Sequence, residues 1–214
     1  EGNSVLKNGF GGYQKIARAL RKGEGAQGAA TVISGALHGV KKEFIPECPP
    51  DVSLELTIPL YCATKGVQSR YVADAICWES SRDEWSSEFW ARVRMGLRSW
   101  SFLFHFFIRV IPLSFSVYGL HLWCHKILRW ILGPLLGLCV FGIMIQQLKT
   151  GGAGPMGWLL DLVVGMMLLG FSALGQRFSV VSFFVLVKAA YCYSFVRYLL
   201  GERAPGWTPE RNRS

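Results

Sequence analysis

The chain has 214 residues, of which 51% are hydrophobic and only 17% are charged, and its formal net charge is +9. This composition excludes a disordered chain, which would combine low hydrophobicity with abundant charge. Six cysteines among 214 residues are too sparse for a small disulfide-stapled scaffold. Most apolar residues follow residue 100, which indicates a membrane protein with a polar N-terminal part.

Residues 1–83 form a basic, polar N-terminal region, for which we expect short helices and a small mixed α/β or irregular structure. The segment YQKIARALRK at residues 13–22 is basic and amphipathic, which predicts a helix. In residues 51–61 apolar side chains alternate with other residues, the period-two pattern of a strand. We therefore expect a strand at 51–61, with Pro59 placing its end at a sheet edge.

Residues 84–100 predict an amphipathic helix that lies on the membrane surface and leads into the first membrane span. Tryptophan and arginine side chains together suit the headgroup region of a bilayer. The residues that we assign to this interface are Trp85, Arg92, Arg94, Arg98 and Trp100.

Residues 101–200 contain four apolar windows of the length that a helix needs to cross about 30 Å of hydrocarbon. The windows are 101–124, 127–145, 156–175 and 178–200, joined by short connections. The predicted fold is therefore mainly α, a polytopic protein with about four transmembrane helices in two hairpins. As an alternative, Arg109 and Pro112 break the first window and leave an interfacial helix followed by three crossings. Residues 201–214 predict an extended tail.

The placement of basic residues predicts the orientation in the membrane. Thirteen Lys and Arg precede residue 99, whereas few lie on the opposite side of a four-span topology. The positive-inside rule then puts both termini in the cytosol, the matrix or the stroma. The first residue is Glu rather than Met, which is compatible with a removed presequence. We expect a mitochondrial or other organellar inner membrane, with a viral or endoplasmic reticulum membrane as the alternative.

Charged residues inside spans are the first candidates for a special role, because each costs a few kcal/mol at mid-membrane. Asp161 and Lys188 fall near each other when the last hairpin is folded about its turn. We expect an ion pair between them, which either fixes helix packing or belongs to a transport path. Gly133 and Gly137 form a GxxxG motif, which predicts close approach of another helix.

Histidines are the only candidates for cofactor ligands, and the candidates are His105, His121 and His125. His121 and His125 are four residues apart, a spacing that can hold a metal ion. No neighbouring carboxylate completes such a site, so no metal is predicted. A haem held with a partner chain stays open, and a bound phospholipid is expected. The cysteines show no CxxC spacing and are expected to be free thiols.

The sequence contains no catalytic motif, so we expect no enzyme. The leading hypothesis is a non-catalytic subunit with a structural or assembly role in a larger membrane complex of respiratory, ATP synthase or photosynthetic type. Its expected partners are membrane lipids and other membrane subunits. Nucleic acid is not expected, because topology and anionic lipid account for the basic residues. The alternatives are a small transporter or channel that uses Asp161 and Lys188, and a membrane protein cut from a viral polyprotein.

Overall fold

The computed structural model describes residues 2–77, 84–150 and 179–204. In chain order the helices are α1 (Gly2–Ala26), η1 (Lys42–Phe44), α2 (Leu54–Thr64), α3 (Trp85–Leu113), α4 (Val117–Leu122), η2 (Trp123–Ile127), α5 (Leu128–Thr150) and α7 (Ser179–Leu199). The η1 segment is a 3₁₀ turn and η2 is a π-helical turn. No strand occurs in these residues, and the only sheet-like pairing among them is an isolated bridge between Ala29 and Ser69. The prediction of a mainly helical chain is confirmed.

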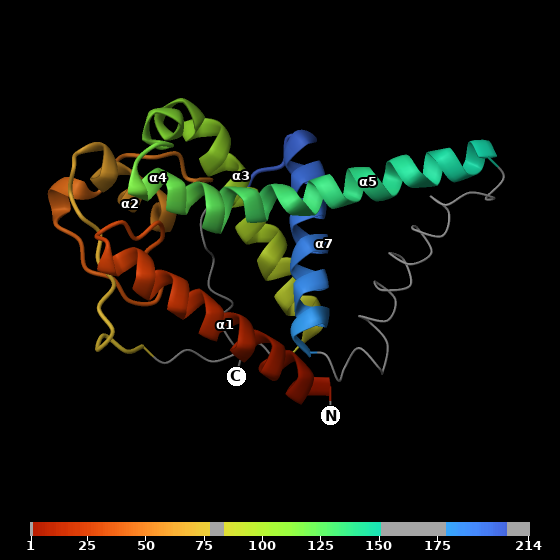
Figure 1. Ribbon diagram of the computed structural model, residues 1–214, viewed down its shortest axis with the longest axis horizontal. Coiled ribbons are helices and arrows are strands. Elements are labelled where there is room, and N and C mark those ends of the chain that lie inside the picture. Colours follow the sequence, from red (N-terminus) through yellow and green to blue (C-terminus); the bar gives the residue numbers. More distant parts are fainter. Residues whose placement is uncertain (1, 78–83, 151–178, 205–214) are drawn as a thin grey trace.

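Helices α3 and α7 lie side by side and form the centre of the molecule, and α1 and α5 both pack on α7 (Figure 1). Gly96 of α3 allows the close approach, because a Cβ at this position would overlap Ser194 of α7. Beside it, the indole Nε1 of Trp100 donates a hydrogen bond of 3.1 Å to the Ser194 hydroxyl. A small residue on one helix and a hydroxyl on the other therefore hold the pair together.

The main hydrophobic core lies where α2, α4 and the start of α5 pack against α3. Phe102 of α3 has no exposed surface and meets the ring of Trp130 edge-on, with 6.4 Å between ring centroids. Leu122 and Ile127, at either side of the π-helical turn, are also fully buried. Burying a side chain of this size contributes about 1.5–3 kcal/mol, so these residues stabilise the packing of α3 against α4 and α5.

The predicted strand at 51–61 is wrong, since the chain forms helix α2 over Leu54–Thr64. Consecutive side chains of this segment are buried, Leu56 and Thr57 among them. The segment therefore has no exposed polar face whose spacing would tell a helix from a strand. Pro59 inside the helix leaves the carbonyl of Glu55 without its usual helical donor. The backbone N–H of Ile33 donates to this carbonyl at 3.1 Å, so the loop after α1 replaces the hydrogen bond that Pro59 cannot make.

The first predicted span, 101–124, does not form one helix. Helix α3 continues without interruption from the predicted surface helix to Leu113, one residue after Pro112. A tight turn follows, in which the Ser116 hydroxyl accepts a hydrogen bond from the N–H of Gly119 at 3.1 Å. A Cβ on Gly119 would overlap the Leu113 carbonyl, so the turn requires glycine there. The chain thus breaks near Pro112, as the alternative interpretation expected.

From Val117 the chain stays helical to Thr150, and the connection predicted at His125 and Lys126 is absent because the π-helical turn η2 joins α4 to α5. Within the described ranges, Val117–Lys149 is the one helical run long and apolar enough to cross a membrane. Helix α7 occupies the window predicted at 178–200. The window at 156–175 lies outside the described residues, so four crossings remain a prediction.

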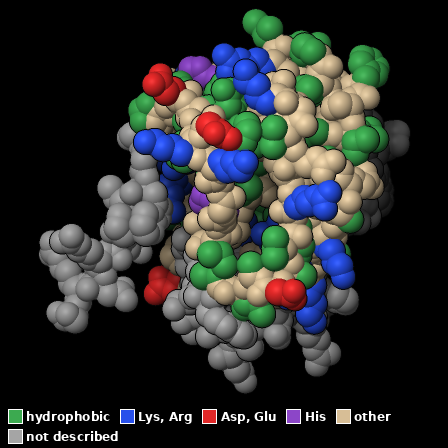
Figure 2. Space-filling view, turned by 90° about the vertical axis from the view of Figure 1, so that its left-hand side faces the viewer, with side chains coloured by type: hydrophobic (Ala, Val, Ile, Leu, Met, Phe, Trp, Pro, Cys, Tyr) green, Lys and Arg blue, Asp and Glu red, His purple; other side chains and the backbone are tan. Residues whose placement is uncertain are grey.

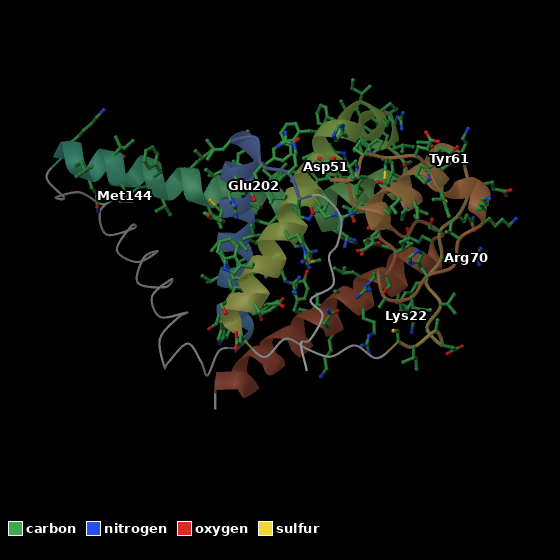
Figure 3. The ribbon with its side chains drawn as sticks, turned by 180° about the vertical axis from the view of Figure 1, so that it is seen from behind. Lys22, Asp51, Tyr61, Arg70, Met144 and Glu202 are labelled. Atoms are coloured by element: carbon green, nitrogen blue, oxygen red, sulfur yellow. The ribbon has the colours of Figure 1, made fainter. Side chains whose placement is uncertain are left out.

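The C-terminal half of α5 projects beyond α7 and away from the rest of the described chain (Figure 1). Met144 marks this projecting part, far from the other labelled side chains in Figure 3. Just after α7, Arg203 lies 3.9 Å from the carboxylate of Asp51, which links the end of α7 to the segment before α2. One half of α5 is therefore built into the fold, and the other half is uncovered by the parts described.

Candidate functional site

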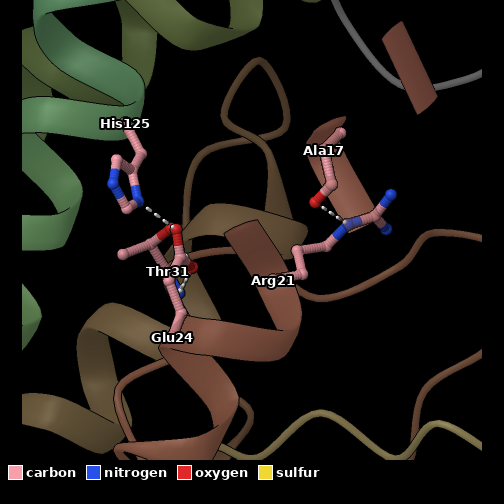
Figure 4. A network of polar contacts seen from close by, with 5 residues as sticks. All are labelled: Ala17, Arg21, Glu24, Thr31 and His125. Carbon is pink, nitrogen blue, oxygen red and sulfur yellow. Dashed lines mark hydrogen bonds and ion pairs between the residues drawn. The ribbon is translucent and has the colours of Figure 1, made fainter. Parts of the chain in front are cut away.

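A buried carboxylate, Glu24, lies at the C-terminal end of α1 and joins three separate parts of the chain (Figure 4). It is only 2% exposed. Its Oε2 accepts hydrogen bonds from the backbone N–H of Thr31 at 2.9 Å and from the Thr31 hydroxyl at 2.8 Å. Its Oε1 lies 2.8 Å from Nδ1 of His125. Glu24 therefore ties helix α1 and the following loop to the helical run that contains His125.

The π-helical turn Trp123–Ile127 carries His125. Such turns insert an extra residue into a helix and are frequent at functional positions. The rings of His121 and His125 stack, with centroids 5.3 Å apart and planes 10° from parallel. Because an ionised carboxylate has no hydrogen to donate, Nδ1 of His125 carries the hydrogen of the bond to Glu24.

Opposing effects set the charge state of Glu24. Burial raises the pKa of this carboxyl, but hydrogen bonds from Thr31 and His125 and the nearby Lys126 ammonium outweigh that effect. The pKa of Glu24 therefore lies below its usual value of 4.5, and the group is a carboxylate at neutral pH. A charged, hydrogen-bonded group in this position fixes geometry, because each bond to it is stronger than one between neutral partners.

A cavity of about 210 Å³ lies beside this network, lined by Tyr118, the residues 66–69 and the turn after α3. It is smaller than the roughly 300–1,000 Å³ of most small-molecule sites. The Tyr118 hydroxyl and Nδ1 of His121 are buried, and neither has a hydrogen-bond partner among the described residues. The arrangement offers buried polar groups near a partly open pocket, and within the described parts of the chain it shows no nucleophile paired with a base.

The predicted ion pair between Asp161 and Lys188 falls partly outside the described residues, because Asp161 is not among them. Lys188 is 5% exposed. Its ammonium donates a hydrogen bond of 2.7 Å to the backbone carbonyl of Arg129 and lies 5.1 Å from the ring centre of Phe184. Lys188 therefore connects α7 to the first turn of α5.

The two glycines of the GxxxG motif, Gly133 and Gly137, lie against α7. A Cβ on Gly133 would come within 2.8 Å of the Lys188 carbonyl oxygen and 3.3 Å of the Cys192 nitrogen. A Cβ on Gly137 would come within 2.6 Å of the Cys192 sulfur. The approach of α5 to α7 is thus close enough that the backbone of one helix touches that of the other.

The residues assigned to the headgroup region mostly have protein partners instead. Trp100 is 2% exposed and bonded to Ser194, as described above. Arg98 donates a hydrogen bond of 2.7 Å to the backbone carbonyl of Val52. Trp85 packs partly buried against the start of α7, and Arg94 is half-buried.

Arg92 is also internal: it is 8% exposed and pairs with Glu88 at 2.6 Å. Its guanidinium lies 5.4 Å from the ring centre of Tyr13 on α1 and 5.3 Å from that of Phe183 on α7. The headgroup assignment of Arg92 and Trp100 is therefore corrected. Helix α3 meets α1 and α7 on the face that was expected to meet lipid.

Of the histidines considered as cofactor ligands, the structure brings only His121 and His125 together, whereas His105 lies exposed on α3. Within the described parts of the chain, no group of three His, Cys, Asp or Glu side chains is placed to hold a metal ion. All six cysteines are described and carry free thiols.

Sequence reasoning missed Glu24 and Thr31. A signal was present, because Glu24 is the only carboxylate between residues 2 and 42 and lies in a basic segment. No known protein family, no curated protein and no solved structure matches the chain. The site is therefore judged by its own geometry, which is that of a buried polar junction between helices.

Proposed function

We propose that this protein is a non-catalytic, membrane-embedded subunit of a larger membrane protein complex. The observation that carries the proposal is the helical run Val117–Lys149, whose most apolar window is only 22% buried. The core helix of a soluble protein would be mostly buried. The large apolar side chains exposed on this run include Leu135, Leu138, Phe141, Met144 and Leu148. Exposed apolar surface of this extent is typical of a membrane or protein interface.

Two further helices support the same proposal. The second half of α3 exposes Phe104, Phe107 and Ile108, the last of them 83% exposed. Near the end of α7, Val196 and Leu199 are exposed as well. Figure 2 shows a face of the molecule on which Lys and Arg side chains lie among apolar ones. Apolar helices beside a basic face suit a protein that contacts both the hydrocarbon and the anionic surface of a membrane.

The polar contacts of the described residues favour a structural role over catalysis or transport. Glu24 and Lys188 are both occupied by bonds that join separate helices. A transporter that uses Asp161 and Lys188 would lose flux in the variant Asp161→Asn without losing stability. In a structural subunit, the same variant would lower assembly, and the added change Lys188→Met would restore it.

The proposed location is an organellar inner membrane, with the basic parts of the chain on the matrix or stroma side. The argument is the excess of Lys and Arg, which gives the net charge of +9. Localisation of the native protein by immunogold labelling tests the proposal. Detection in a secretory membrane would contradict it.

Blue-native electrophoresis of mildly solubilised native membranes, followed by mass spectrometry, tests the subunit role. We expect the chain to migrate with a complex much larger than its own mass of 23.9 kDa. Migration as a monomer or a small homo-oligomer, under conditions that preserve a known complex of the same membrane, would contradict the proposal.

A further inference from the structure

We propose that Lys126, Arg129 and Lys188 form a binding site for a phosphate-bearing anion, which in a membrane is the headgroup of an acidic phospholipid. The inference deepens the proposed function and rests on its membrane location for the source of the phosphate. The site lies where α5 begins and α7 crosses it, beside the glycine contact described above.

Two helices bring the three cations together. Lys126 lies in the π-helical turn and Arg129 in the first turn of α5, so the two are three residues apart on one helical run. Lys188 reaches across from α7, and its ammonium is 2.7 Å from the backbone oxygen of Arg129. The charge of Arg129 acts against the charges of both lysines, and Arg21 on α1 adds a further repulsive charge at Lys126.

The described carboxylates do not balance this charge. Glu24 and Glu55 act favourably on Lys126, but these two carboxylates stand against four cations, Lys126, Arg129, Lys188 and Arg21. No described carboxylate forms an ion pair or hydrogen bond with the guanidinium of Arg129. Cations held in mutual repulsion bind an added anion more tightly, because the anion removes the repulsion as well as forming new bonds.

Arg92, an arginine close to the same aromatic ring, has a carboxylate partner and serves for comparison. Arg92 and Arg129 both lie near the ring of Tyr13, at 5.4 and 5.6 Å from its centre. Arg92 has the carboxylate of Glu88 at 2.6 Å, whereas the guanidinium of Arg129, which is half-buried, meets only the aromatic ring among the described residues. A guanidinium presents paired N–H donors that match the oxygens of a phosphate group. Among the described residues, the guanidinium of Arg129 therefore has no anionic partner.

The depth of the site fits a lipid headgroup. Arg129 lies in the first turn of α5, directly before the apolar residues that lead to Leu148. A helix that enters the hydrocarbon after Arg129 places its guanidinium at the level of the phosphates. Juxtamembrane Lys and Arg attract anionic lipid by about 1 kcal/mol each, which corresponds to about fivefold in affinity.

The test measures binding to the full-length protein in an uncharged detergent by native mass spectrometry. The probes are short-chain phosphatidic acid, phosphatidylcholine of the same chain length, and inorganic phosphate. The variants are Arg129→Gln and, as a matched control, Arg109→Gln. Arg109 also lies over an aromatic ring, that of Phe106 at 5.3 Å, but it belongs to α3 and is no part of the proposed site.

We expect the wild type to prefer phosphatidic acid over phosphatidylcholine, and Arg129→Gln to weaken the binding of phosphatidic acid about fivefold while Arg109→Gln leaves it unchanged. Equal effects of the two variants would overturn the site. Circular dichroism checks that both variants keep the helical content of the wild type. If Arg129→Gln unfolds, competition between inorganic phosphate and phosphatidic acid on the wild-type protein replaces it, and the absence of competition overturns the site.

Two further outcomes separate the sources of the anion. Binding of inorganic phosphate that depends on Arg129, without any binding of phosphatidic acid, would keep the anion site and overturn the lipid as its ligand. The membrane location is tested separately, by the localisation experiment described above. The third variant is Asp161→Asn. A gain of tenfold or more in its affinity for phosphatidic acid would show that the carboxylate of Asp161 occupies the proposed anion site in the wild type. That result would overturn the proposal.

Discussion

At the scale of single residues, Glu24 is a buried carboxylate that joins three separate parts of the described fold. One carboxylate receives the N–H and hydroxyl of Thr31 and the imidazole of His125, and it is almost completely buried. A buried acceptor that loses its charge weakens every bond made to it, while the donors remain shielded from water. The contribution of Glu24 to stability should therefore exceed that of any exposed carboxylate in the chain.

We predict that Glu24→Gln lowers the free energy of unfolding by about 2–4 kcal/mol, because the amide group would place a donor against Thr31 or His125. Thermal unfolding in detergent, followed by circular dichroism, measures the effect. The matched control is Glu47→Gln, an exposed glutamate, for which we expect a change within about 0.5 kcal/mol. Equal melting temperatures for the two variants would refute the role of Glu24.

The depressed pKa of Glu24 predicts a pH dependence of stability. The folded pKa lies below the usual 4.5, so the stabilisation is fully present above pH 4.5 and is lost as the pH falls through the folded pKa. The difference in melting temperature between the wild type and Glu24→Gln should therefore be largest at neutral pH and shrink in acid. A difference that grows on acidification would show that the carboxylate is not the stabilising form.

At the scale of elements, the contact between α5 and α7 depends on glycine. The backbones approach so closely at Gly133 that a Cβ would press on the Lys188 carbonyl, a group that cannot rotate away. Gly142 lies on the same helix and has nothing within 4 Å of an added Cβ. Gly133 therefore has no room for a side chain, whereas Gly142 has open space around it.

We predict opposite results for alanine at these two glycines. Gly142→Ala should be neutral or stabilising by up to about 1 kcal/mol, because alanine favours a helix over glycine. Gly133→Ala should destabilise by about 1–3 kcal/mol, because the added methyl group forces the helices apart. Resistance of the purified protein to proteolysis, with melting temperature as a second measurement, distinguishes the two. If both variants behave alike, α5 does not pack on α7 through Gly133.

At the scale of the whole molecule, the described helices form a packed corner from which one half of α5 extends uncovered (Figure 1). Lipid or a neighbouring subunit is expected to cover this half, since its large apolar side chains meet nothing else among the described residues. The cysteines report on this directly. Cys139 is exposed on α5 and Cys77 is exposed on the loop before α3.

We predict that a membrane-impermeant maleimide, added to opened native membranes, modifies Cys77 but not Cys139. After solubilisation that disperses lipid and partners, Cys139 should react as well, and peptide mass spectrometry reads both sites. Cys62 serves as the control that stays unmodified in the folded protein, because burial shields it and raises the pKa of its thiol. Modification of Cys139 in intact membranes would contradict a covered α5.

Sequence alone determined much of the helical content, because helix formation is read from local patterns. The basic amphipathic segment 13–22 lies within α1. The segment 84–100 coincides with the first part of α3 to within one residue, and the windows 127–145 and 178–200 overlap α5 and α7. The same kind of local pattern gave a wrong prediction at 51–61. Side chains on both faces of this segment are buried there, so the alternation of residue types does not indicate a strand with one exposed face.

Only the tertiary structure decided which residues meet. Glu24 and His125 are 101 positions apart, and no pattern in either neighbourhood points to the other. Trp100 and Arg92 have the composition of a headgroup belt, yet they face α7 and α1, because helix packing settles which side of α3 is covered. Local sequence sets the preference for helix over a few turns, whereas burial and pairing depend on residues that only the complete fold brings together.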